Sequence, residues 1–484
     1  MLRFGTDGVR GLANADLSPE LVLALGRAAA RVLRPYPALV GEAGAVAERP
    51  RFLVGRDTRR SGPLLQAALA AGLASEGLDV VDVGVMPTPA VAFISAELHA
   101  PAAVISASHN PYWDNGVKFF SAGGLKLVDE VEEALEAELE QLLAAGGPGT
   151  LRATAPGRGA PTAVTGADVG RFVADAGALE RYERYVVGCL QGRRLDGLQV
   201  VLDCANGSAS ATAPQIFAAA GAEIRSVLAG EPDGTNINDG CGSTDPRGLA
   251  SAVVSQGADL GLAFDGDADR VIAVDSAGNV VDGDRLVALF ATDLAEQGLL
   301  EGATVVVTVM TNLGFHQAMA AAGVKVHTVA VGDRSVLEAL DANGWALGGE
   351  QSGHIIFRSL ATTGDGVLSG LLLADLVHRK GPPLGELAAA ALRRSPQVLR
   401  SVAVANRDGL AGAAAVWAEV ERTERILGPR GRVLLRPSGT EPLVRVMVEA
   451  PTEEEAEQVV ERLVGALHAA LGEPGESRGG SPAL

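Results

Sequence analysis

A chain of 484 residues is too long for one hydrophobic core, because single cores stop growing at about 250 to 300 residues, so several domains are expected. Apolar residues make up 47% of the sequence but aromatic residues only 4%, so Ala, Val and Leu must fill the core, which favours an α/β protein. The formal net charge of −19 argues against a general nucleic-acid or membrane-surface binder, because both partners are densely negative. A small anionic ligand can still bind where basic groups gather.

The cysteines and the apolar stretches bear on where the protein works. Cys189, Cys204 and Cys241 are too few and too scattered for a disulfide framework, so they are expected to be reduced thiols in a cytoplasmic protein. The first residues, MLRFGTDGVRG, carry charge and glycine where an export signal needs an apolar run. The most apolar later stretch, residues 367–377, is shorter than the roughly 20 residues of a membrane span and is predicted to be a buried helix. No membrane or nucleic-acid partner is expected.

Three stretches share one pattern, in which an alanine-rich helix ends at a glycine and a β-branched strand follows: LASEGLDVVDVGV, FAAAGAEIRSVLAG and MAAAGVKVHTVAVG. Their glycines, Gly77, Gly221 and Gly323, stand where a helix C-cap needs a left-handed residue. The repetition predicts three related mixed-sheet α/β domains. We expect these domains over residues 1–165, 166–272 and 273–390.

Each repeat also has a second apolar strand that runs into a polar, glycine-containing loop: AAVISASHNP, LGLAFDGDADR and WALGGEQSGH. Because ligands of open α/β sheets bind beyond the carboxyl ends of the strands, the three loops are candidate walls of a single cleft. Residues 35–51 and 146–165 are expected to be loop-like insertions.

After about residue 390 the pattern changes to strand, helix, two strands and helix, which predicts a compact α+β domain over residues 391–472. Thr452 and Glu455 form a capping box for the last helix. One apolar stripe of that helix is expected to face the core: Val459, Val460, Leu463, Val464 and Leu467. The tail, residues 473–484, is rich in Gly, Ser and Pro and is expected to be disordered.

Three acidic residues alternate in FDGDADR directly after an apolar strand: Asp265, Asp267 and Asp269. Their carboxylates can turn toward one hard cation, although an ordinary Asp-Gly turn is the alternative. An EF-hand is excluded, because Arg270 and Ser276 stand where its loop needs Gly and Glu. The pattern favours a magnesium-type site, beside which Arg270 suits a phosphate.

A serine-rich junction of strand and loop, ISASHNP, contains Ser106, Ser108 and His109, and Lys118 follows downstream. A G-x-S-x-G elbow is missing, so an acyl hydrolase is not supported. Serine and histidine in a turn are often structural, because Ser and Asn bond the local backbone and Pro111 stops the strand. A nucleophilic serine is the functional alternative.

Two further loops are rich in groups that bind ligands. GGEQSGH places Glu350, Ser352 and His354 at alternate positions, where they can bond sugar hydroxyls or an amine, unless the loop is a solvated hairpin turn. RPSGTEPLVRV combines two guanidinium groups with hydroxyls and backbone N–H groups, as phosphate binding requires, although a turn with an Arg-Glu surface pair is the alternative. The residues of this candidate phosphate clamp are Arg436, Ser438, Gly439, Thr440 and Arg445.

A nucleophile loop, a metal loop, a polyol-binding loop and a phosphate clamp, one in each expected domain, together describe phosphoryl transfer to and from a sugar phosphate. Seven ordered motifs show that the chain resembles the α-D-phosphohexomutases, and within them the bacterial branch that acts on glucosamine phosphates. The motifs are FGTDGVRG, ISASHNPYWDNGVKFF, PDGTNINDGCGSTD, FDGDADR, GGEQSGHII, TTGDG and RPSGTEPLVRVMVE.

The resemblance implies four domains around a central cleft and a phosphoserine at Ser108. This serine would exchange phosphoryl groups with glucosamine 6-phosphate and glucosamine 1-phosphate through a 1,6-bisphosphate, a step toward amino-sugar nucleotides and cell-wall precursors. One Mg²⁺ per active site would be held by Ser108, Asp265, Asp267 and Asp269. The implied groups around the phosphate are His109, Lys118, Arg10 and Arg270, with Lys118 our candidate acid/base residue. The implied substrate contacts are Gly332, Asp333, Glu350, Ser352, His354 and the phosphate clamp.

The resemblance also implies the partners: a small hexosamine phosphate as substrate, glucose or glucosamine 1,6-bisphosphate as primer, and a second copy of the chain in a homodimer. Ala268 stands where many relatives have glycine, which leaves every metal ligand in place. One alternative is a phosphomannomutase or phosphoglucomutase that uses the same residues on a neutral hexose. The other is a non-catalytic sugar-phosphate sensor, which would be expected to lack Ser108 or part of the acidic set.

Overall fold

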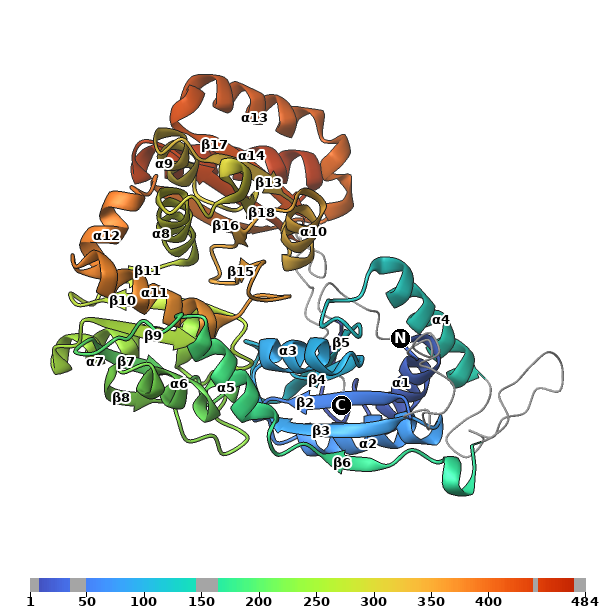
Figure 1. Ribbon diagram of the computed structural model, residues 1–484. Coiled ribbons are helices and arrows are strands. Elements are labelled where there is room, and N and C mark those ends of the chain that lie inside the picture. The colour runs from blue at the N-terminus through green and yellow to red at the C-terminus, as the bar shows by residue number, and fades with distance from the viewer. Residues whose placement is uncertain (1–7, 35–48, 145–163, 438–442, 474–484) are drawn as a thin grey trace, which may run out of the picture. The chain divides into compact units, whose positions relative to one another are not determined.

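The computed structural model describes residues 8–34, 49–144, 164–437 and 443–473 (Figure 1). The chain forms two compact units. The first unit comprises residues 1–310 and 324–391, and the second comprises residues 311–323 and 392–484. Most of each expected insertion and all but the first residue of the expected disordered tail lie outside the described residues.

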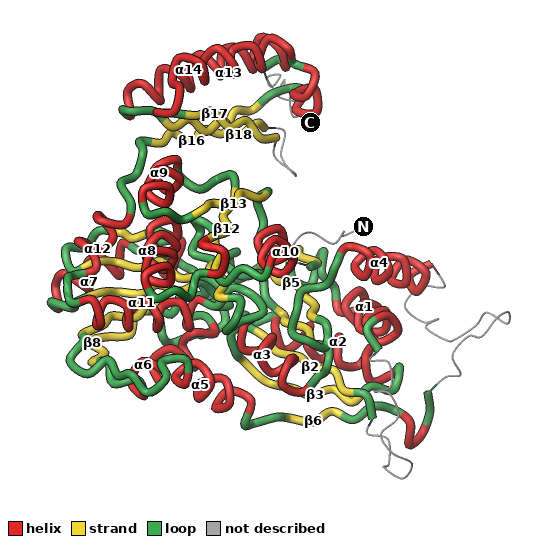
Figure 2. The backbone as a smooth tube through the Cα atoms, turned by 45° about the horizontal axis from the view of Figure 1, so that its top comes forward, coloured by secondary structure: helices red, strands yellow, loops and turns green. Residues whose placement is uncertain are grey.

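The first sheet belongs to the first unit and is mixed, as predicted. Its strands are, in spatial order, β1 (Val9–Leu12), β5 (Asp114–Phe120), β4 (Ala102–Ile105), β2 (Arg51–Arg56), β3 (Asp79–Val85) and β6 (Phe172–Ala174). The helices around it are α1 (Pro19–Val32), α2 (Gly62–Ser75), α3 (Thr88–Leu98) and α4 (Asp129–Ala144). Strands β4, β2, β3 and β6 run parallel, while β1 and β5 are antiparallel to their neighbours. Helix α1 packs against both α2 and α4 (Figure 2).

The second and third sheets are also in the first unit and are also mixed. The second sheet contains, in spatial order, β11 (Val280–Val281), β10 (Val271–Asp275), β9 (Leu260–Phe264), β7 (Gln199–Asp203) and β8 (Glu223–Leu228). The third contains β13 (Lys325–Val329), β12 (Thr304–Thr308), β14 (Leu347–Gly349) and β15 (Ile355–Phe357). The remaining helices of this unit are α5 (Ala178–Gly188), α6 (Ala213–Ala219), α7 (Arg247–Gln256), α8 (Gly283–Glu296), α10 (Asp333–Asn343), α11 (Gly366–Lys380) and α12 (Leu384–Ala391).

The second unit has a three-stranded antiparallel sheet of β16 (Gln397–Ala403), β18 (Leu443–Glu449) and β17 (Arg432–Pro437). Its helices are α9 (Leu313–Ala321), α13 (Ala414–Leu427) and α14 (Glu453–Leu471). The Thr452 hydroxyl caps α14 by accepting from the backbone N–H of Glu455 at 3.2 Å, as the sequence predicts. The predicted stripe of α14 is buried except for Val464, which is partly buried against the same core.

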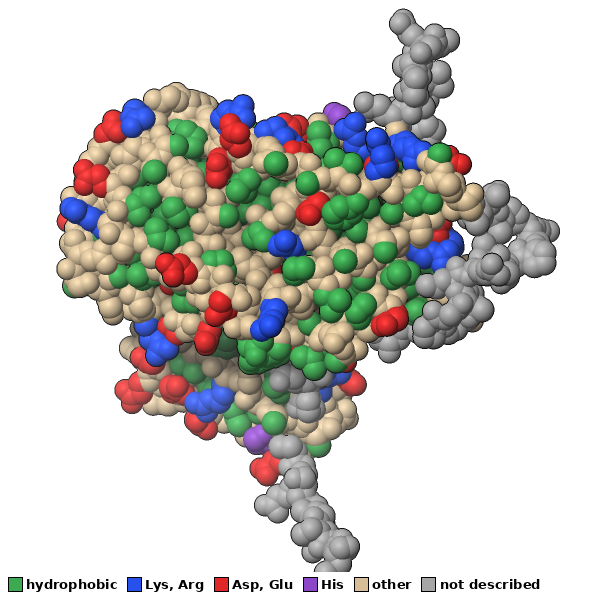
Figure 3. All heavy atoms as spheres, turned by 90° about the horizontal axis from the view of Figure 1, so that it is seen from below, with side chains coloured by type: hydrophobic (Ala, Val, Ile, Leu, Met, Phe, Trp, Pro, Cys, Tyr) green, Lys and Arg blue, Asp and Glu red, His purple; other side chains and the backbone are tan. Residues whose placement is uncertain are grey.

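The repeat prediction is confirmed at the level of secondary structure. Gly77, Gly221 and Gly323 follow α2, α6 and α9 with φ angles of +89°, +98° and +72°, and β3, β8 and β13 come next. The stretch predicted as a buried helix is α11, whose apolar residues between 367 and 377 are mostly buried. None of the described helices is long and apolar enough to cross a membrane. On the described part of the face in Figure 3, basic and acidic side chains are interspersed.

Candidate active site

Ser108 lies in the loop after β4, with its side chain turned toward the second sheet. It is 1% exposed, and its Oγ donates a hydrogen bond of 2.7 Å to Oδ2 of Asp265. Its φ of +51° is in the left-handed region, which residues with a side chain rarely adopt. The Oγ of Ser106 instead donates to Asp57 at 2.6 Å and accepts from the Ser108 N–H at 2.9 Å. Ser108 therefore presents its hydroxyl to the carboxylates, while Ser106 supports the loop.

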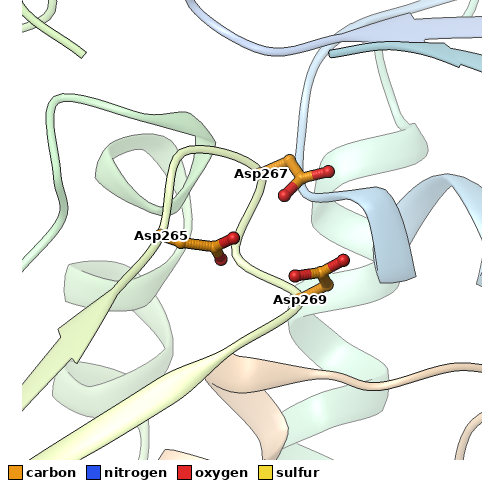
Figure 4. Close-up of side chains that lie close together, drawn as sticks. All are labelled: Asp265, Asp267 and Asp269. Carbon is orange, nitrogen blue, oxygen red and sulfur yellow. The ribbon is translucent and has the colours of Figure 1, made fainter. Parts of the chain in front are cut away.

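Three carboxylates converge beside Ser108 in the loop between β9 and β10 (Figure 4). Asp265, Asp267 and Asp269 are buried, and each offers an oxygen within 4.8 Å of the others. Burial raises the pKa of Asp265 well above its ordinary value, and the charges of Asp269 and Asp267 add to the rise. Among the described residues, Oδ1 of Asp267 is buried with no hydrogen-bond partner. Clustered carboxylate oxygens with unused acceptor capacity fit a hard cation such as Mg²⁺.

Two residues of the first sheet region reach this acidic cluster. Lys118, on β5, donates from Nζ to Asp267 at 2.8 Å and lies 3.4 Å from Asp269. Thr88, the first residue of α3, donates its hydroxyl to Oδ2 of Asp267 at 2.7 Å. The sequence singled out Lys118 but missed Thr88, because MPTPA carries no local signal beyond the start of a helix. Both contacts connect the first sheet to the loop of the second.

His109 and two arginines lie around Ser108. Nδ1 of His109 is 3.2 Å from Nη1 of Arg270 and 3.4 Å from Oγ of Ser108. Burial, together with the charges of Arg270 and of Arg10 on β1, lowers the pKa of His109 to about 4. His109 is therefore neutral at pH 7, and its Nδ1 accepts from the Arg270 guanidinium.

The predicted sugar loop lies between β14 and β15. Oε1 of Glu350 accepts from the backbone N–H of Gly332 at 3.2 Å, so two separate predicted segments meet. His354 is buried, with Nε2 at 3.5 Å from Oδ2 of Asp333. The Ser352 hydroxyl is buried and has no hydrogen-bond partner among the described residues. This loop offers a carboxylate, an imidazole and a hydroxyl to a ligand.

The sugar loop and the metal loop are in contact. Arg270 and His354 form an antiparallel β-bridge. The TTGDG segment also supports the metal loop, because the backbone N–H of Gly366 donates to the Ala268 carbonyl at 3.0 Å. Asp365 accepts from the first turn of α11 and is fully buried beside this contact. The sequence identified TTGDG as a motif of the resemblance but assigned no role to Asp365 or Gly366.

The phosphate clamp belongs to the second unit. Arg436 on β17 and Arg445 on β18 are directly opposite each other in the antiparallel register. Two guanidinium groups side by side on a sheet can bind one phosphate. The other predicted clamp residues, Ser438, Gly439 and Thr440, lie outside the described residues.

The chain matches the four domains of one protein family, described as phosphoglucomutase/phosphomannomutase. The matches cover residues 1–145 (alpha/beta/alpha domain I), 180–278 (alpha/beta/alpha domain II), 282–395 (alpha/beta/alpha domain III) and 399–466 (C-terminal domain). The chain therefore belongs to the phosphoglucomutase/phosphomannomutase family. This membership confirms the resemblance and the fold class inferred from the sequence motifs.

Similar proteins agree with this assignment. The chain is 51% identical to a phosphoglucosamine mutase of Rhodococcus opacus, over 96% of this chain and 98% of the relative. It is 52% identical to a phosphoglucosamine mutase of Frankia alni, over 97% and 99% of the two chains. A crystal structure of a phosphoglucomutase/phosphomannomutase family protein from Burkholderia thailandensis has the same fold, with a TM-score of 0.75 at 24% identity, covering 96% of this chain and 97% of that one.

Proposed function

We propose that this protein interconverts glucosamine 6-phosphate and glucosamine 1-phosphate through a phosphoserine at Ser108 and a 1,6-bisphosphate intermediate. The reaction is an intramolecular phosphotransfer, the isomerase activity of a phosphoglucosamine mutase. The observation that carries the chemistry is the buried Ser108 hydroxyl, 2.7 Å from Asp265 in a cluster of three carboxylates. The choice of glucosamine rests on the relatives of that name, which match nearly the whole chain at 51% and 52% identity.

In the first transfer, the bond between phosphorus and Ser108 Oγ breaks and a bond to a sugar hydroxyl oxygen forms, while that hydroxyl loses a proton and Ser108 Oγ gains one to become a hydroxyl again. Lys118 is our candidate for exchanging this proton, and with Arg10 and Arg270 it offsets negative charge on the phosphoryl group. Neutral His109 accepts from Arg270 and so orients that guanidinium without adding a charge. In the second transfer the bisphosphate has turned over, and Ser108 recovers the other phosphoryl group.

Asp265, Asp267 and Asp269, together with a phosphoryl oxygen on Ser108, would hold one Mg²⁺ in each active site. When bound, the ion offsets negative charge on the transferring phosphoryl group. The raised pKa of Asp265 supports this assignment, because neighbouring buried carboxylates resist being charged together until a cation joins them.

The remaining loops would orient the sugar. Glu350, Ser352 and His354 offer polar groups to its hydroxyls and amine, and Gly332 and Asp333 lie against them. The buried Ser352 hydroxyl supports this role, because a buried group of this kind is unfavourable until a ligand bonds it. The clamp would bind the phosphate that does not react, in both orientations of the intermediate. Its residues are Arg436, Ser438, Gly439, Thr440 and Arg445.

Three further features complete the proposal. Glucose or glucosamine 1,6-bisphosphate would prime Ser108, because an unphosphorylated serine has no group to donate. The protein would work in the cytoplasm, in keeping with its three free cysteines, and as a homodimer. Cell fractionation and size-exclusion chromatography with light scattering test the last two features.

The phosphoserine is tested by intact-mass measurement after incubation with glucose 1,6-bisphosphate. Wild type should take up a phosphoryl group, and Ser106→Ala should still do so but more slowly, because it loses the hydrogen bond to the Ser108 N–H. Ser108→Ala should take up none and should lose mutase activity. The two substituted serines are two positions apart, so Ser106→Ala controls for general damage to this segment. Full activity in Ser108→Ala would remove this serine from the mechanism.

The sugar is tested by side-by-side turnover of glucosamine, glucose and mannose 6-phosphates. We expect the highest kcat/KM with glucosamine 6-phosphate. A preference for mannose or glucose would reassign the protein to the neutral-hexose mutases. Binding without turnover of any of the three would instead indicate a sugar-phosphate sensor.

A further inference from the structure

Arg59, in the loop after β2, is a completely buried arginine that serves the Ser108 loop. It is 1% exposed, and its Nε donates to Oδ2 of Asp57 at 2.8 Å. Its remaining hydrogen bonds all go to backbone carbonyls of one segment. Nη2 donates to Ser108 at 2.9 Å and Asn110 at 2.8 Å, and Nη1 donates to Asp114 at 3.1 Å and to Pro111.

Asp57 extends this support to the other side of Ser108. Its Oδ2 accepts from both Arg59 Nε and the Ser106 hydroxyl, and that hydroxyl in turn accepts from the Ser108 N–H at 2.9 Å. Ser108 is thus held at its N–H by Ser106 and at its carbonyl by Arg59. Both contacts fix a residue whose φ of +51° is unfavourable without support.

Asn238 reaches the same carbonyls from the second sheet region. Its Nδ2 donates to the Ser108 carbonyl at 2.9 Å and to the Asn110 carbonyl at 3.1 Å. Both neighbours are acceptors, so the amide group must face them with its NH₂, and its Oδ1 is buried with no hydrogen-bond partner among the described residues. This orientation serves the loop and leaves the side chain's own acceptor unsatisfied.

Arg59 and Asn238 lie on opposite sides of the contact between the first and second sheet regions. Other hydrogen bonds also hold this contact. Thr58 donates its hydroxyl to the Asn206 carbonyl at 2.6 Å, and the Arg60 N–H donates to the Gly234 carbonyl at 2.9 Å. The segment that carries Arg59 is therefore bound to the loops that flank Asn238. The carbonyl of Ser108 is shared between these two parts of the first unit.

We propose that Arg59 and Asn238 form a carbonyl clamp that positions Ser108 for phosphoryl transfer. The proposal rests on the proposed role of Ser108 as the phosphoryl carrier. Both side chains act on the backbone of the loop and not on the sugar, so they are positioning residues. Two clamped carbonyls on one side and a held N–H on the other fix the loop backbone in the conformation in which the Ser108 Oγ reaches Asp265.

Asn238 offers the cleaner test, because a buried arginine with five bonds can be needed for folding. Asn238 has a φ of +58°, so Asn238→Gly removes the amide without backbone strain, and Asn238→Asp keeps the shape but replaces the donor by an acceptor. Asn14 is the matched control, because it is exposed, has a φ of +62° and lies outside the clamp. Arg59→Lys, which keeps the charge beside Asp57, is the second clamp variant.

A misplaced reacting group lowers the rate of the chemical step without changing contacts to the rest of the substrate. We expect kcat to fall about 10- to 100-fold in Asn238→Gly and further in Asn238→Asp, with KM for the sugar phosphate within about threefold of wild type. Transfer from pre-phosphorylated Ser108 to substrate in a single turnover should slow by the same factor. Asn14→Gly should match wild type in all three measurements.

Different results would overturn the carbonyl clamp and the phosphoserine at Ser108. If Ser108→Ala abolishes activity but Asn238→Gly and Asn14→Gly have the same kcat, the clamp is overturned and the phosphoserine stands. A rise in KM with unchanged single-turnover transfer would also overturn the clamp, since it would place Asn238 in substrate binding. If Ser108→Ala retains activity, the proposed function fails first.

Discussion

The buried carboxyl group of Asp365 should make the protein less stable as the pH rises from about 4 to about 6. Its Oδ1 accepts from the backbone N–H of Leu368 at 2.9 Å, and the Tyr182 hydroxyl lies 2.9 Å from both of its oxygens. Burial raises the pKa of Asp365 from 3.8 to about 6, although the hydrogen bonds from Leu368 and Tyr182 oppose the rise.

The direction and the size of the stability change follow from the two pKa values of Asp365, 3.8 in the unfolded chain and about 6 in the folded protein. Below pH 3.8, Asp365 is protonated in both the folded and the unfolded chain, so its charge has no effect on stability. Between 3.8 and about 6 the folded protein binds the proton more strongly, so stability is lost as the pH rises through this window. A difference of about two in pKa, at about 1.4 kcal/mol each, makes the loss about 3 kcal/mol above pH 6.

Asp365→Asn removes this loss. Asparagine caps a helix as well as aspartate does, and its oxygen can accept from Leu368 and Tyr182. Above pH 6 we expect the variant to be about 3 kcal/mol more stable than wild type, because the pKa of about 6 already includes the hydrogen bonds by which the N-terminus of α11 favours the carboxylate. Near pH 4 the advantage should vanish.

The assay is the difference in thermal unfolding midpoint between the two proteins from pH 4.5 to 8, so that the other carboxyl groups cancel. Tyr182→Phe is the matched variant, because it removes a hydrogen bond that lowers the pKa of Asp365 and should extend the sensitive window to higher pH. A variant Asp365→Asn that is less stable than wild type at pH 7.5, or a difference that does not change with pH, would refute the reasoning.

Three other outcomes can be checked with purified protein. Removal of divalent ions by a chelator should abolish mutase activity, and Mg²⁺ should restore it, whereas unchanged activity in the chelator would exclude a required metal. Gly366→Ala should weaken Mg²⁺ binding at least about tenfold in calorimetry, because the new Cβ would lie 2.2 Å from the Arg270 carbonyl oxygen and displace the metal loop. Gly465→Ala is the control: a Cβ there meets open space, so this variant should bind Mg²⁺ as wild type does. Ala268→Gly should increase the free energy of unfolding by up to about 1 kcal/mol without changing Mg²⁺ affinity, because Ala268 has a φ of +56°, which glycine adopts more easily. A lower unfolding midpoint than that of wild type would contradict this.

Local patterns were sufficient for much of the fold and part of the site. The change from helical to strand periodicity at Gly77, Gly221 and Gly323 predicts three related units, and each of these helices does end there. The alternation of Asp265, Asp267 and Asp269 predicts converging carboxylates, because spacing along a short loop limits where the side chains can point. These features depend on residues close together in the chain.

Position in the tertiary structure decided the rest. Ser108 and Asp265 are 157 positions apart, and only packing of the first sheet region against the second brings the hydroxyl within 2.7 Å of the carboxylate. The low pKa of His109 likewise comes from burial beside Arg270, which no local pattern records. Local sequence therefore determined which groups could do chemistry, whereas long-range packing decided which of them meet and in what protonation state, because burial and distance set hydrogen bonds and charge.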